Sequence, residues 1–541
     1  MTVMGEVNLT SRIRRALSGP ARRTQQQTSP PPPLALQGAE KLRAFVSAEI
    51  QKGDLVVISN REPYSHEWTA AGEAVVKQPA SGLVTAIEPV LRACGGTWIA
   101  HGCGNADRAH TDQDGRLGVP PAAPEYTLRR LWIDEEEYEH YYSGLANEAL
   151  WPLCHMAHTQ PMFRPQDWLA YQAVNETFAR AAVAETTTDG LVLIQDYHFA
   201  LVPRMIRKSA PHLVSSLFWH IPWPNAEAFG ICPWKEALLE GMLGADILGF
   251  HTKRYCLNFL ESAQRYLECR VDMEEMSIEL GGHRTLVRAY PISVEWPYPS
   301  ASRAQGEAMR ASFGIGRDVH ISVGIDRADY TKGLIERVAA VELMLEENPS
   351  LLGKYVLVQL ASPTRSSVRR YREFADDLRE AVDRVNERFG TAEWQPIILQ
   401  VKTFSPDEVR ACYRMADSVL VTPLHDGMNL VAKEYVAACD NGDGALVLSE
   451  LAGAAKELDG ALLVNPYDTQ QMADAILRAV KMPIAERRAR MQVMREQIAA
   501  HSIYDWSENL LRDMTDARKH AARFWPQRTP AAEPDRQAMA R

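Results

Sequence analysis

The sequence predicts an α/β protein of two Rossmann-like lobes, each a doubly wound parallel sheet, with a cleft between them. Its 541 residues exceed what one hydrophobic core usually supports. Hydrophobic residues form 46% of the chain and charged residues 24%, which is ordinary for a globular enzyme. Two successive series of short runs rich in Val, Ile and Leu alternate with helical stretches, and this is the pattern of repeated βα units.

The N-terminal residues 1–36 differ from the rest in composition. They combine arginines with a QQQ and a PPPP run and can bury little apolar surface, so we expect a disordered arm. A role for the arm in RNA binding or targeting is the less favoured alternative, because short basic tracts are common.

The first lobe is predicted over residues 37–295. A helix over about 38–51 leads into DLVVISN, an apolar run typical of a buried parallel strand. LVLIQDY and LVSSLFWHI read as further strands, and WKEALLEGMLGA and TKRYCLNFLESAQRYL as amphipathic helices. The prolines of TLVRAYPISVEWP disfavour continued regular structure, so we expect an interdomain linker near 291–300.

The second lobe is predicted over residues 296–485. Its strands are the apolar runs HISVGID, YVLVQLA, PIILQVK, SVLVTPL, GALVLSE and ALLVNPY. Residues 486–525 are charged and periodic and are expected to form helices that pack across both lobes, and residues 526–541 a flexible tail. Two doubly wound sheets favour a ligand in the cleft, at the carboxyl ends of strands from both lobes.

Charge and cysteine content narrow the classes of partner and location. The formal charge of −10 gives no global attraction to nucleic acid or to anionic lipid. No apolar run reaches the roughly 20 residues that cross a bilayer. The eight cysteines contain no CxxC pair and fall mostly in apolar segments, as reduced core thiols do. We therefore expect a cytoplasmic protein that binds neither nucleic acid nor membrane. The sequence leaves its oligomeric state open, a homo-oligomer included.

The strongest local motif is DRADYTKG, directly after the strand HISVGI. It places Arg327 and Lys332 at the carboxyl end of a strand, facing the cleft. A guanidinium grips phosphate oxygens in pairs and an ammonium adds a compact charge, so the two suit a diphosphate leaving group. A surface ion cluster with Asp326 and Asp329 is an alternative of about equal weight when the motif is taken alone.

The second motif, HDGMNLVAKEY, follows the strand SVLVTP and opens a predicted helix. Gly427 lets the backbone approach a ligand, and the amides of residues 428–431 can receive phosphate or sugar hydroxyls at the helix N-terminus. Glu434 is placed to bind both hydroxyls of a ribose, and Asp426 to accept sugar hydroxyls. The alternatives are that Asp426 is only a helix cap and Glu434 an exposed residue.

In the first lobe, QDYHF and FWHIPWPN lie at the ends of two strands, and Asp196 and His220 are their informative members. Taken singly, each is more often a cap or a core group, but together at successive strand ends they favour a functional role. The loop SNREPY, with PASGLVTAIEP, resembles a phosphate-facing turn with Arg61 as the charge and Gly82 as the close approach.

The stretch YYSGLANEALWPLCH places Tyr142 and Trp151 near a helix end. These side chains are either core aromatics or the polar-tipped walls of a sugar-phosphate site, and the residues alone do not decide between the two.

In order and spacing, these motifs resemble the retaining glycosyltransferases of the trehalose-6-phosphate synthase family, from about residue 54 to about residue 515. The motifs that carry the resemblance are SNR, LWPLCH, QDYH, FWHIPWP, DRADYTKG, DGMNLVAKEY, LSELAGAAKEL and LVNPYD. The resemblance implies the two-lobed GT-B fold. It also implies transfer of glucose from UDP-glucose to glucose 6-phosphate, without metal or prosthetic group, and a separate trehalose-phosphate phosphatase downstream.

The resemblance also implies roles for single residues. The donor site would consist of Gly82, Arg327, Lys332, Asp426, Gly427, Met428, Asn429, Leu430, Val431 and Glu434. The catalytic set would be Asp196, His220, Arg327, Lys332 and Asp426, with Asp426 and His220 on the transferred glucose and Asp196 orienting the acceptor hydroxyl. The acceptor would bind Asp196, with Arg61, Tyr142, Trp151 and Arg365 on its phosphate, since these donors can converge on an anion.

Two departures from the family pattern affect the donor base and the acceptor. The usual pair of glycines in the first loop is replaced by Ser81 and Gly82, and His425 precedes DGMN where the family usually has arginine.

No carboxylate pair suited to a covalent glycosyl-enzyme is evident, so the resemblance implies front-face displacement. The alternatives are transfer to glycerol 3-phosphate or a cyclitol phosphate, a non-catalytic sugar-phosphate sensor, and a pyridoxal-phosphate phosphorylase of similar plan. UDP, GDP and ADP remain open as the donor nucleotide.

Overall fold

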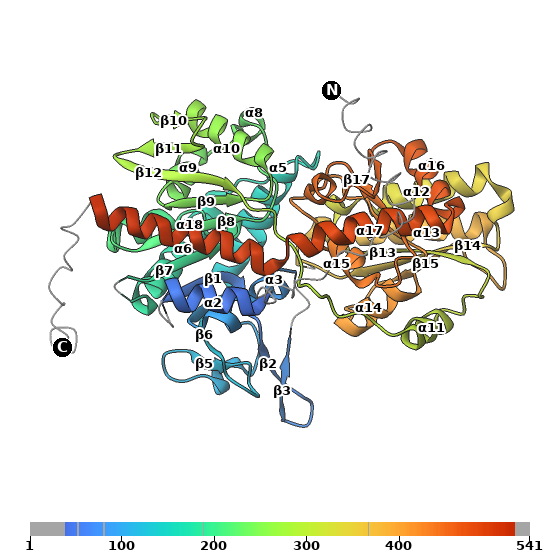
Figure 1. Ribbon diagram of the computed structural model, residues 1–541, viewed down its shortest axis with the longest axis horizontal. Coiled ribbons are helices and arrows are strands. Elements are labelled where there is room, and N and C mark those ends of the chain that lie inside the picture. The colour runs from blue at the N-terminus through green and yellow to red at the C-terminus, as the bar shows by residue number, and fades with distance from the viewer. Residues whose placement is uncertain (1–37, 51–53, 79–81, 188, 366, 525–541) are drawn as a thin grey trace, which may run out of the picture.

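The computed structural model describes residues 38–50, 54–78, 82–187, 189–365 and 367–524, which form two α/β lobes side by side (Figure 1). The predicted arm over 1–36 and the predicted tail over 526–541 lie outside these residues. Each lobe is built on a sheet whose central strands are parallel, so the predicted fold class is confirmed.

Within the described residues, the first lobe has a ten-stranded sheet in the order β10–β11–β12–β9–β8–β7–β1–β4–β6–β5. From β12 to β6 neighbouring strands are parallel. These central strands are β1 (Leu55–Arg61), β4 (Thr97–His101), β6 (Tyr126–Leu131), β7 (Leu191–Gln195), β8 (Val214–Trp219), β9 (Ile247–Phe250) and β12 (His283–Ala289). The sheet therefore brings the ends of DLVVISN, LVLIQDY and LVSSLFWHI to one edge.

The edges of this sheet depart from the all-parallel prediction. β10 (Arg270–Asp272), β11 (Ser277–Leu280) and β5 (Arg116–Val119) pair antiparallel to their neighbours. Gly281 and Gly282 join β11 to β12 with φ of 59° and 80°. Such a two-residue turn requires left-handed backbone at both positions, which glycine adopts without strain.

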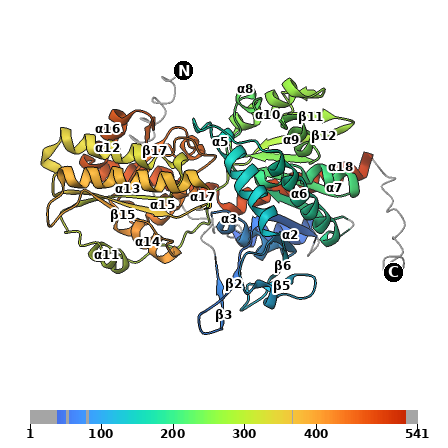
Figure 2. The same cartoon turned by 180° about the vertical axis from the view of Figure 1, so that it is seen from behind.

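Helices cover both faces of the first sheet (Figures 1 and 2). Leu55 and Val57 of β1 pack in the core beneath one layer, whereas Val56 and Ile58 pack beneath the other. The first layer is α2 (Ala39–Glu49), α3 (Gly82–Cys94) and α18 (Ile503–Phe524), and the second is α6 (Pro165–Glu185), α7 (Val202–Ser209), α9 (Lys235–Met242) and α10 (Lys253–Tyr266). Burial on both faces explains the continuous apolar runs in the sequence.

The second lobe has a six-stranded sheet among the described residues, in the order β15–β14–β13–β16–β17–β18, with parallel neighbours throughout. The strands are β13 (His320–Arg327), β14 (Tyr355–Ser362), β15 (Ile397–Gln400), β16 (Ser418–Val421), β17 (Ala445–Ser449) and β18 (Leu462–Val464). The helices are α11 (Arg303–Ser312), α12 (Leu334–Glu347), α13 (Arg369–Phe389), α14 (Pro406–Met415), α15 (Leu430–Ala438), α16 (Thr469–Lys481) and α17 (Ile484–Ala500). Each apolar run predicted as a strand in this lobe is one.

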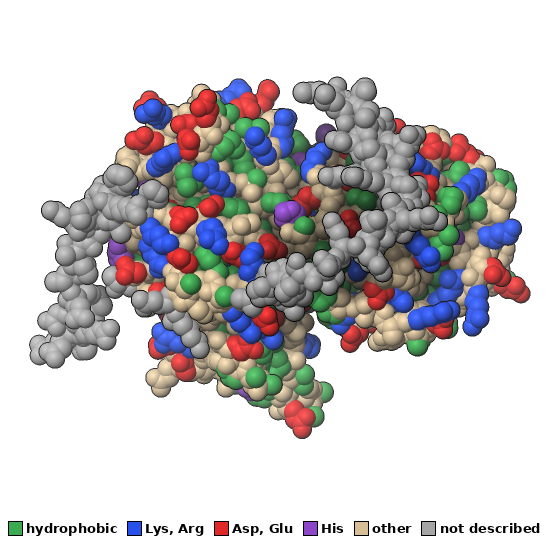
Figure 3. Space-filling model, viewed as in Figure 1, with side chains coloured by type: hydrophobic (Ala, Val, Ile, Leu, Met, Phe, Trp, Pro, Cys, Tyr) green, Lys and Arg blue, Asp and Glu red, His purple; other side chains and the backbone are tan. Residues whose placement is uncertain are grey.

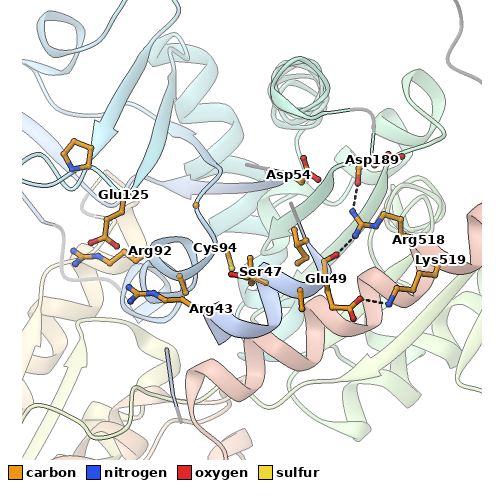
Figure 4. Close-up of a pocket in the computed structure, with 16 residues that line it drawn as sticks. Arg43, Ser47, Glu49, Asp54, Arg92, Cys94, Glu125, Asp189, Arg518 and Lys519 are labelled. Carbon is orange, nitrogen blue, oxygen red and sulfur yellow. Dashed lines mark hydrogen bonds and ion pairs between the residues drawn. The ribbon is translucent and has the colours of Figure 1, made fainter. Parts of the chain in front are cut away.

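The C-terminal helices link the lobes. α17 packs on α15 and β17 of the second lobe, and α18 on α2, α3, β8 and β9 of the first. Arg518 donates to the carbonyls of Glu49 and Asp189 at 2.7 and 2.9 Å, and Lys519 pairs with Glu49 (Figure 4). These bonds close one side of a cavity of about 1160 Å³ in the first lobe.

Residues 290–302 pass between the lobes without helix or strand. Lys433 Nζ donates to the Ile292 carbonyl at 2.7 Å, and the Ile503 amide to the Val294 carbonyl at 3.0 Å. Because Lys433 lies on α15, this crossing segment is fixed to the helix that follows the DGMN motif.

A hairpin that the sequence did not predict follows the SNR motif. β2 (Ser65–Trp68) pairs antiparallel with β3 (Ala74–Lys77), and the hairpin extends away from the first lobe (Figure 1). Trp68, Val75 and Val76 are exposed on it, and apolar side chains are visible there in Figure 3.

Candidate functional site

The two cations of the DRADYTKG motif lie at the carboxyl end of β13 but have different surroundings. Lys332 ends a 3-10 turn, η4 (Tyr330–Lys332), and its Nζ lies 2.6 Å from Asp426 Oδ2. Arg327 is 34% exposed, and its Nη2 lies 3.4 Å from the buried carboxylate of Asp329. The alternative of a surface cluster is therefore wrong for Asp326, which instead forms a buried pair with Arg337 at 2.8 Å.

Neighbouring residues fix the orientation and the charge of the Asp426 carboxylate, which lies in the loop between β16 and α15. Asn429 Nδ2 donates to Asp426 Oδ2 at 3.0 Å, while its own Oδ1 caps α15 by accepting from the Ala432 amide at 3.4 Å. Asn429, not Asp426, is thus the helix cap. Burial alone would raise the pKa of Asp426, yet Lys332 lowers it to about 2. Asp426 is a permanent carboxylate aimed at the ammonium.

Gly427 makes a close approach, but to the protein. A Cβ placed there would lie 2.3 Å from the carbonyl oxygen of His220 in the other lobe. Tyr255 OH, also of the first lobe, donates to the Asp426 carbonyl at 3.2 Å. This glycine therefore allows the loop between β16 and α15 to contact the first lobe.

Leu430 and Val431 open α15, and Met428 precedes it as a buried side chain. Further along the helix, Glu434 accepts from Tyr413 OH at 3.0 Å, and burial raises its pKa. Gly82 is the first residue of α3, and Ser81 before it lies outside the described residues.

Asp196 and His220 meet at the edge of the first sheet, as the two strand ends predict. Asp196 Oδ1 accepts from the amides of Tyr197 at 2.9 Å and His220 at 3.2 Å. Asp196 adopts φ of 77°, a left-handed conformation that is costly for a non-glycine residue and is typical of functional sites. Burial raises the pKa of Asp196 to about 7. This carboxyl can change protonation near neutrality.

The imidazole of His220 is partly buried, and the loss of hydration lowers its pKa well below the ordinary value. Its Nε2 lies 2.6 Å from Gln195 Oε1, an amide oxygen that can only accept a hydrogen bond. His220 is therefore a neutral ring with a proton on Nε2, and its Nδ1 is left as an acceptor.

The four residues predicted to bind an acceptor phosphate form one cluster. Tyr142 lies on a π-helix, η2 (Glu139–Leu150), and Arg61 at the end of β1 hydrogen-bonds to it. Burial alone would raise the pKa of Tyr142, yet Arg365, Arg61 and Arg327 lower it to about 8. Three guanidinium groups thus surround one phenol, and their charge is suited to an anion.

Trp151, the first residue of α5 (Trp151–His155), completes this cluster. The Arg365 and Arg327 guanidiniums lie 4.0 and 5.0 Å from the centre of its ring. Among the described residues, its buried indole Nε1 has no hydrogen-bond partner. A buried donor without a partner is costly, and a bound oxygen at this point would satisfy it.

Two residues of the site were not assigned a role in it from the sequence. Asp329, which the sequence suggested only as a member of a surface ion cluster, is buried, and its Oδ2 lies 3.4 Å from both Arg327 and Arg365. Tyr197 OH accepts from Arg365 at 3.3 Å, across the cleft. Both lie inside quoted motifs, DRADYTKG and QDYHF, but their contacts with Arg365 were not predicted.

His425, the departure from the family pattern, also spans the cleft. Its Nδ1 lies 3.1 Å from the carbonyl of His155, and the His155 ring lies 4.1 Å from Trp151. The loop between β16 and α15 is thereby joined to α5, the helix that begins with Trp151.

Within the described residues, no group of three His, Cys, Asp or Glu side chains is arranged to hold a metal ion. None of the helices in the same residues has the length and apolar character needed to cross a membrane.

Comparisons with known proteins agree on one family. The model of glycosyltransferase family 20 matches residues 53–516. A trehalose-6-phosphate synthase of Mycobacterium avium is 35% identical over 483 residues, which cover 87% of this chain and 96% of that protein. An α,α-trehalose-phosphate synthase (UDP-forming) from Burkholderia xenovorans, solved with glucose 6-phosphate, has a TM-score of 0.73 at 31% identity and covers 85% and 99% of the two chains. A structure from E. coli bound with UDP-2-fluoro glucose has a TM-score of 0.75 at 32% identity and covers 85% and 98%.

Proposed function

We propose, since the chain belongs to glycosyltransferase family 20, that it transfers glucose from UDP-glucose to glucose 6-phosphate, giving α,α-trehalose 6-phosphate and UDP. The observation that carries the proposal is the cluster of Arg61, Arg365 and Arg327 around Tyr142, which lies in the same cleft as the Asp196 carboxyl. An anion site beside a carboxyl that can accept a hydrogen bond from a hydroxyl fits a phosphorylated sugar whose free hydroxyl is the nucleophile. The proposal keeps the cytoplasmic location expected from the sequence.

The proposed mechanism is front-face displacement with retention. The bond from the glucose anomeric carbon to the UDP phosphate oxygen breaks, and the acceptor hydroxyl oxygen bonds to that carbon from the same face. The proton of this hydroxyl passes to the departing phosphate oxygen. Arg327 and Lys332 stabilise the charge on the diphosphate, which is the kind of electrostatic effect that often dominates an enzymatic rate.

The remaining groups hold the two sugars. Asp196 accepts a hydrogen bond from the acceptor hydroxyl and orients it. His220 offers its Nδ1 and Asp426 its carboxylate to hydroxyls of the transferred glucose. Because contacts such as Arg365 to Tyr197 and His425 to His155 cross the cleft, lobe closure assembles the site and excludes water.

We expect no requirement for a metal, because Arg327 and Lys332 supply the positive charge that a divalent ion supplies elsewhere. Turnover should be unchanged in EDTA and unchanged on addition of Mg²⁺. Loss of activity in EDTA that Mg²⁺ restores would contradict this part of the proposal.

The central test is release of nucleoside diphosphate by the purified protein. UDP-, GDP- and ADP-glucose are each supplied with glucose 6-phosphate, glycerol 3-phosphate or no acceptor, and the products are identified by mass and by the NMR couplings of both anomeric protons. UDP release that depends on glucose 6-phosphate, with both anomeric protons α, supports the proposal. Release only with another acceptor or nucleotide would retain the transferase and replace its substrate. Absence of any transfer would support a sugar-phosphate sensor.

One variant and one control test the proposed role of Asp196 in orienting the acceptor hydroxyl. Asp196→Asn keeps the shape of the side chain but removes its charge, so kcat should fall by about 10² or more while glucose 6-phosphate still binds. Glu67→Ala, at an exposed cross-strand pair with Lys77, should leave kcat unchanged.

A further inference from the structure

A buried ionic cluster lies at the base of the β2–β3 hairpin, outside the groups used above. Arg130 of β6 lies 2.7 Å from Glu62 Oε2 and 2.9 Å from Asp107 Oδ1. The three side chains are 0%, 1% and 0% exposed. Charges this deep in a protein are costly to bury, so such a cluster is weak evidence for a purely stabilising role.

The cluster forms hydrogen bonds to the backbone at the start of the hairpin and to the loop after β4. Arg130 Nη2 donates to the Tyr64 carbonyl at 2.8 Å. Asp107 accepts from the amides of His66 and Gly104, both at 2.6 Å, and Glu62 accepts from the amide of Cys103 at 3.0 Å. The segment that leaves β1 and the loop that leaves β4 are thereby fixed to each other.

Arg61 directly precedes Glu62 in the chain, so its backbone is attached to a member of this cluster. Successive side chains of an extended chain point to opposite sides, and here Glu62 is buried in the cluster while Arg61 is exposed and turned to Tyr142. The β1–β4 ladder shifts its register between Ile58 and Arg61, and Arg61 pairs with His101 after the shift. Irregularities of this kind change the direction of nearby side chains, so the contacts of Glu62 can also determine where Arg61 points.

We propose that Glu62 and Arg130 are positioning residues for Arg61, which through them is held against Tyr142 in the acceptor-anion site. The inference deepens the proposed function and rests on it for the identity of the acceptor. The anion itself does not touch Glu62 or Arg130. Their effect reaches the acceptor through the direction of the Arg61 side chain.

The balance of charge in the cluster decides which variant to make. Two carboxylates face one guanidinium, and burial raises the pKa of Glu62 to about 7. Glu62→Ala leaves Arg130 paired with Asp107, a neutral combination, whereas Arg130→Met would leave two buried carboxylates without the guanidinium that balances their charge. Glu62→Gln is nearly isosteric, but its single oxygen can accept from only one of the two donors, and Arg130, which donates to Oε2 at 2.7 Å, is the closer one.

The test compares phosphorylated and unphosphorylated acceptors. In Glu62→Ala, kcat/KM for glucose 6-phosphate should fall about tenfold, as expected when one charge-assisted hydrogen bond is weakened. Turnover with glucose and the KM for UDP-glucose should stay within about twofold of the wild type. Glu62→Gln, which keeps the bond from Arg130, should restore part of the preference for glucose 6-phosphate, and Glu67→Ala in the adjoining hairpin should retain it in full.

A double mutant gives the decisive result. If Glu62 acts through Arg61, Glu62→Ala should have no further effect on kcat/KM in an Arg61→Ala background. Equal losses with both acceptors, additive losses in the double mutant, or no loss at all would overturn the inference.

Calorimetric titration with inorganic phosphate separates this inference from the proposed function, since it measures the anion site without turnover. Weaker phosphate binding by Glu62→Ala, comparable to that of Arg61→Ala, supports the inference even if the wild type does not transfer glucose to glucose 6-phosphate. Unchanged phosphate binding overturns it.

Discussion

The two sides of the cleft balance their charges differently. On the proposed donor side, the ammonium of Lys332 is neutralised by Asp426, and Lys332 lowers the pKa of Asp426 to about 2 against the effect of burial. On the proposed acceptor side, Arg61 and Arg365 face the Asp329 carboxylate and the Tyr142 phenol, and Arg327, which we also propose to contact the diphosphate, lies next to both groups. A neutral ion pair can orient the hydroxyls of a bound sugar, whereas an excess of guanidinium groups attracts a bound anion such as a phosphate.

Because of this difference, substitutions in the two places should affect different quantities: protein stability in one case and ligand affinity in the other. Removing one member of the balanced pair leaves a buried charge, which costs stability as well as activity. Removing one guanidinium from the acceptor cluster lowers an excess of like charge, so its main cost should be in affinity. The predictions below use this contrast.

The largest effect is expected for Lys332→Ala. Without the ammonium, kcat should fall by about 10² to 10³, because one electrostatic contact to the leaving group is lost. The free energy of unfolding should fall by about 3–5 kcal/mol, because Asp426 is left buried and unpaired. Steady-state kinetics and denaturant unfolding measure the two losses.

The double variant Lys332→Ala with Asp426→Asn serves as the control. It should recover most of the stability and none of the turnover, since the unpaired carboxylate is gone but the cation is still missing. If Lys332→Ala is as stable as the wild type, the pair is not balanced in the way described here.

A smaller effect, confined to the acceptor, is expected for Arg365→Met. The KM for glucose 6-phosphate should rise by about 10- to 100-fold, the range of a hydrogen bond to a charged group, while the KM for UDP-glucose changes little. Arg369→Met, at an exposed residue paired with Glu373, is the control and should behave as the wild type. Equal weakening of both substrates would show that Arg365 holds the lobes together rather than the acceptor.

The sequence predicted the parts of the fold that are local. In the second lobe the central strands β13, β14, β16 and β17 are largely buried on both faces, and their continuous apolar runs revealed them. The edge strands β15 and β18 are partly exposed but keep the same Ile- and Leu-rich composition. The β2–β3 hairpin was missed because its strands are only four residues long, and because three of the four residues of SHEW are polar and AVVK is largely exposed. The antiparallel edges were missed because strands such as β10 are only three or four residues long.

The candidate site divides in the same way. Asp196, His220, Lys332 and Asp426 lie in motifs at strand ends, so the parallel topology predicts that they face one cleft. Arg365 lies in a loop after β14 without a motif, and only the family resemblance indicated it. The pairing of Lys332 with Asp426 depends on the three-dimensional arrangement of two loops 94 residues apart, which no local pattern encodes.

The smallest expected effect sharpens the comparison through pH. Burial alone would raise the pKa of Tyr142, but Arg365 and Arg61 lower it to about 8, so the free protein should form a phenolate above that pH. The phenolate then competes with the acceptor phosphate for the same guanidiniums. The KM for glucose 6-phosphate should therefore rise with pH above about 8, by at most about tenfold per pH unit. Below that pH the neutral phenol donates a hydrogen bond to the phosphate, so Tyr142 should cause no further change in KM.

Tyr142→Phe tests the cause of this pH dependence. The variant should bind glucose 6-phosphate a few-fold more weakly at pH 7, since one neutral hydrogen bond is worth about 1 kcal/mol, and its KM should no longer rise above pH 8. The ring of Tyr138 stacks on Tyr142 with centroids 5.0 Å apart, but burial raises the pKa of Tyr138, so Tyr138→Phe should keep the wild-type profile. If the rise in KM persists in Tyr142→Phe, the titrating group lies elsewhere, and the acceptor cluster does not carry the excess of positive charge that distinguishes it from the donor side.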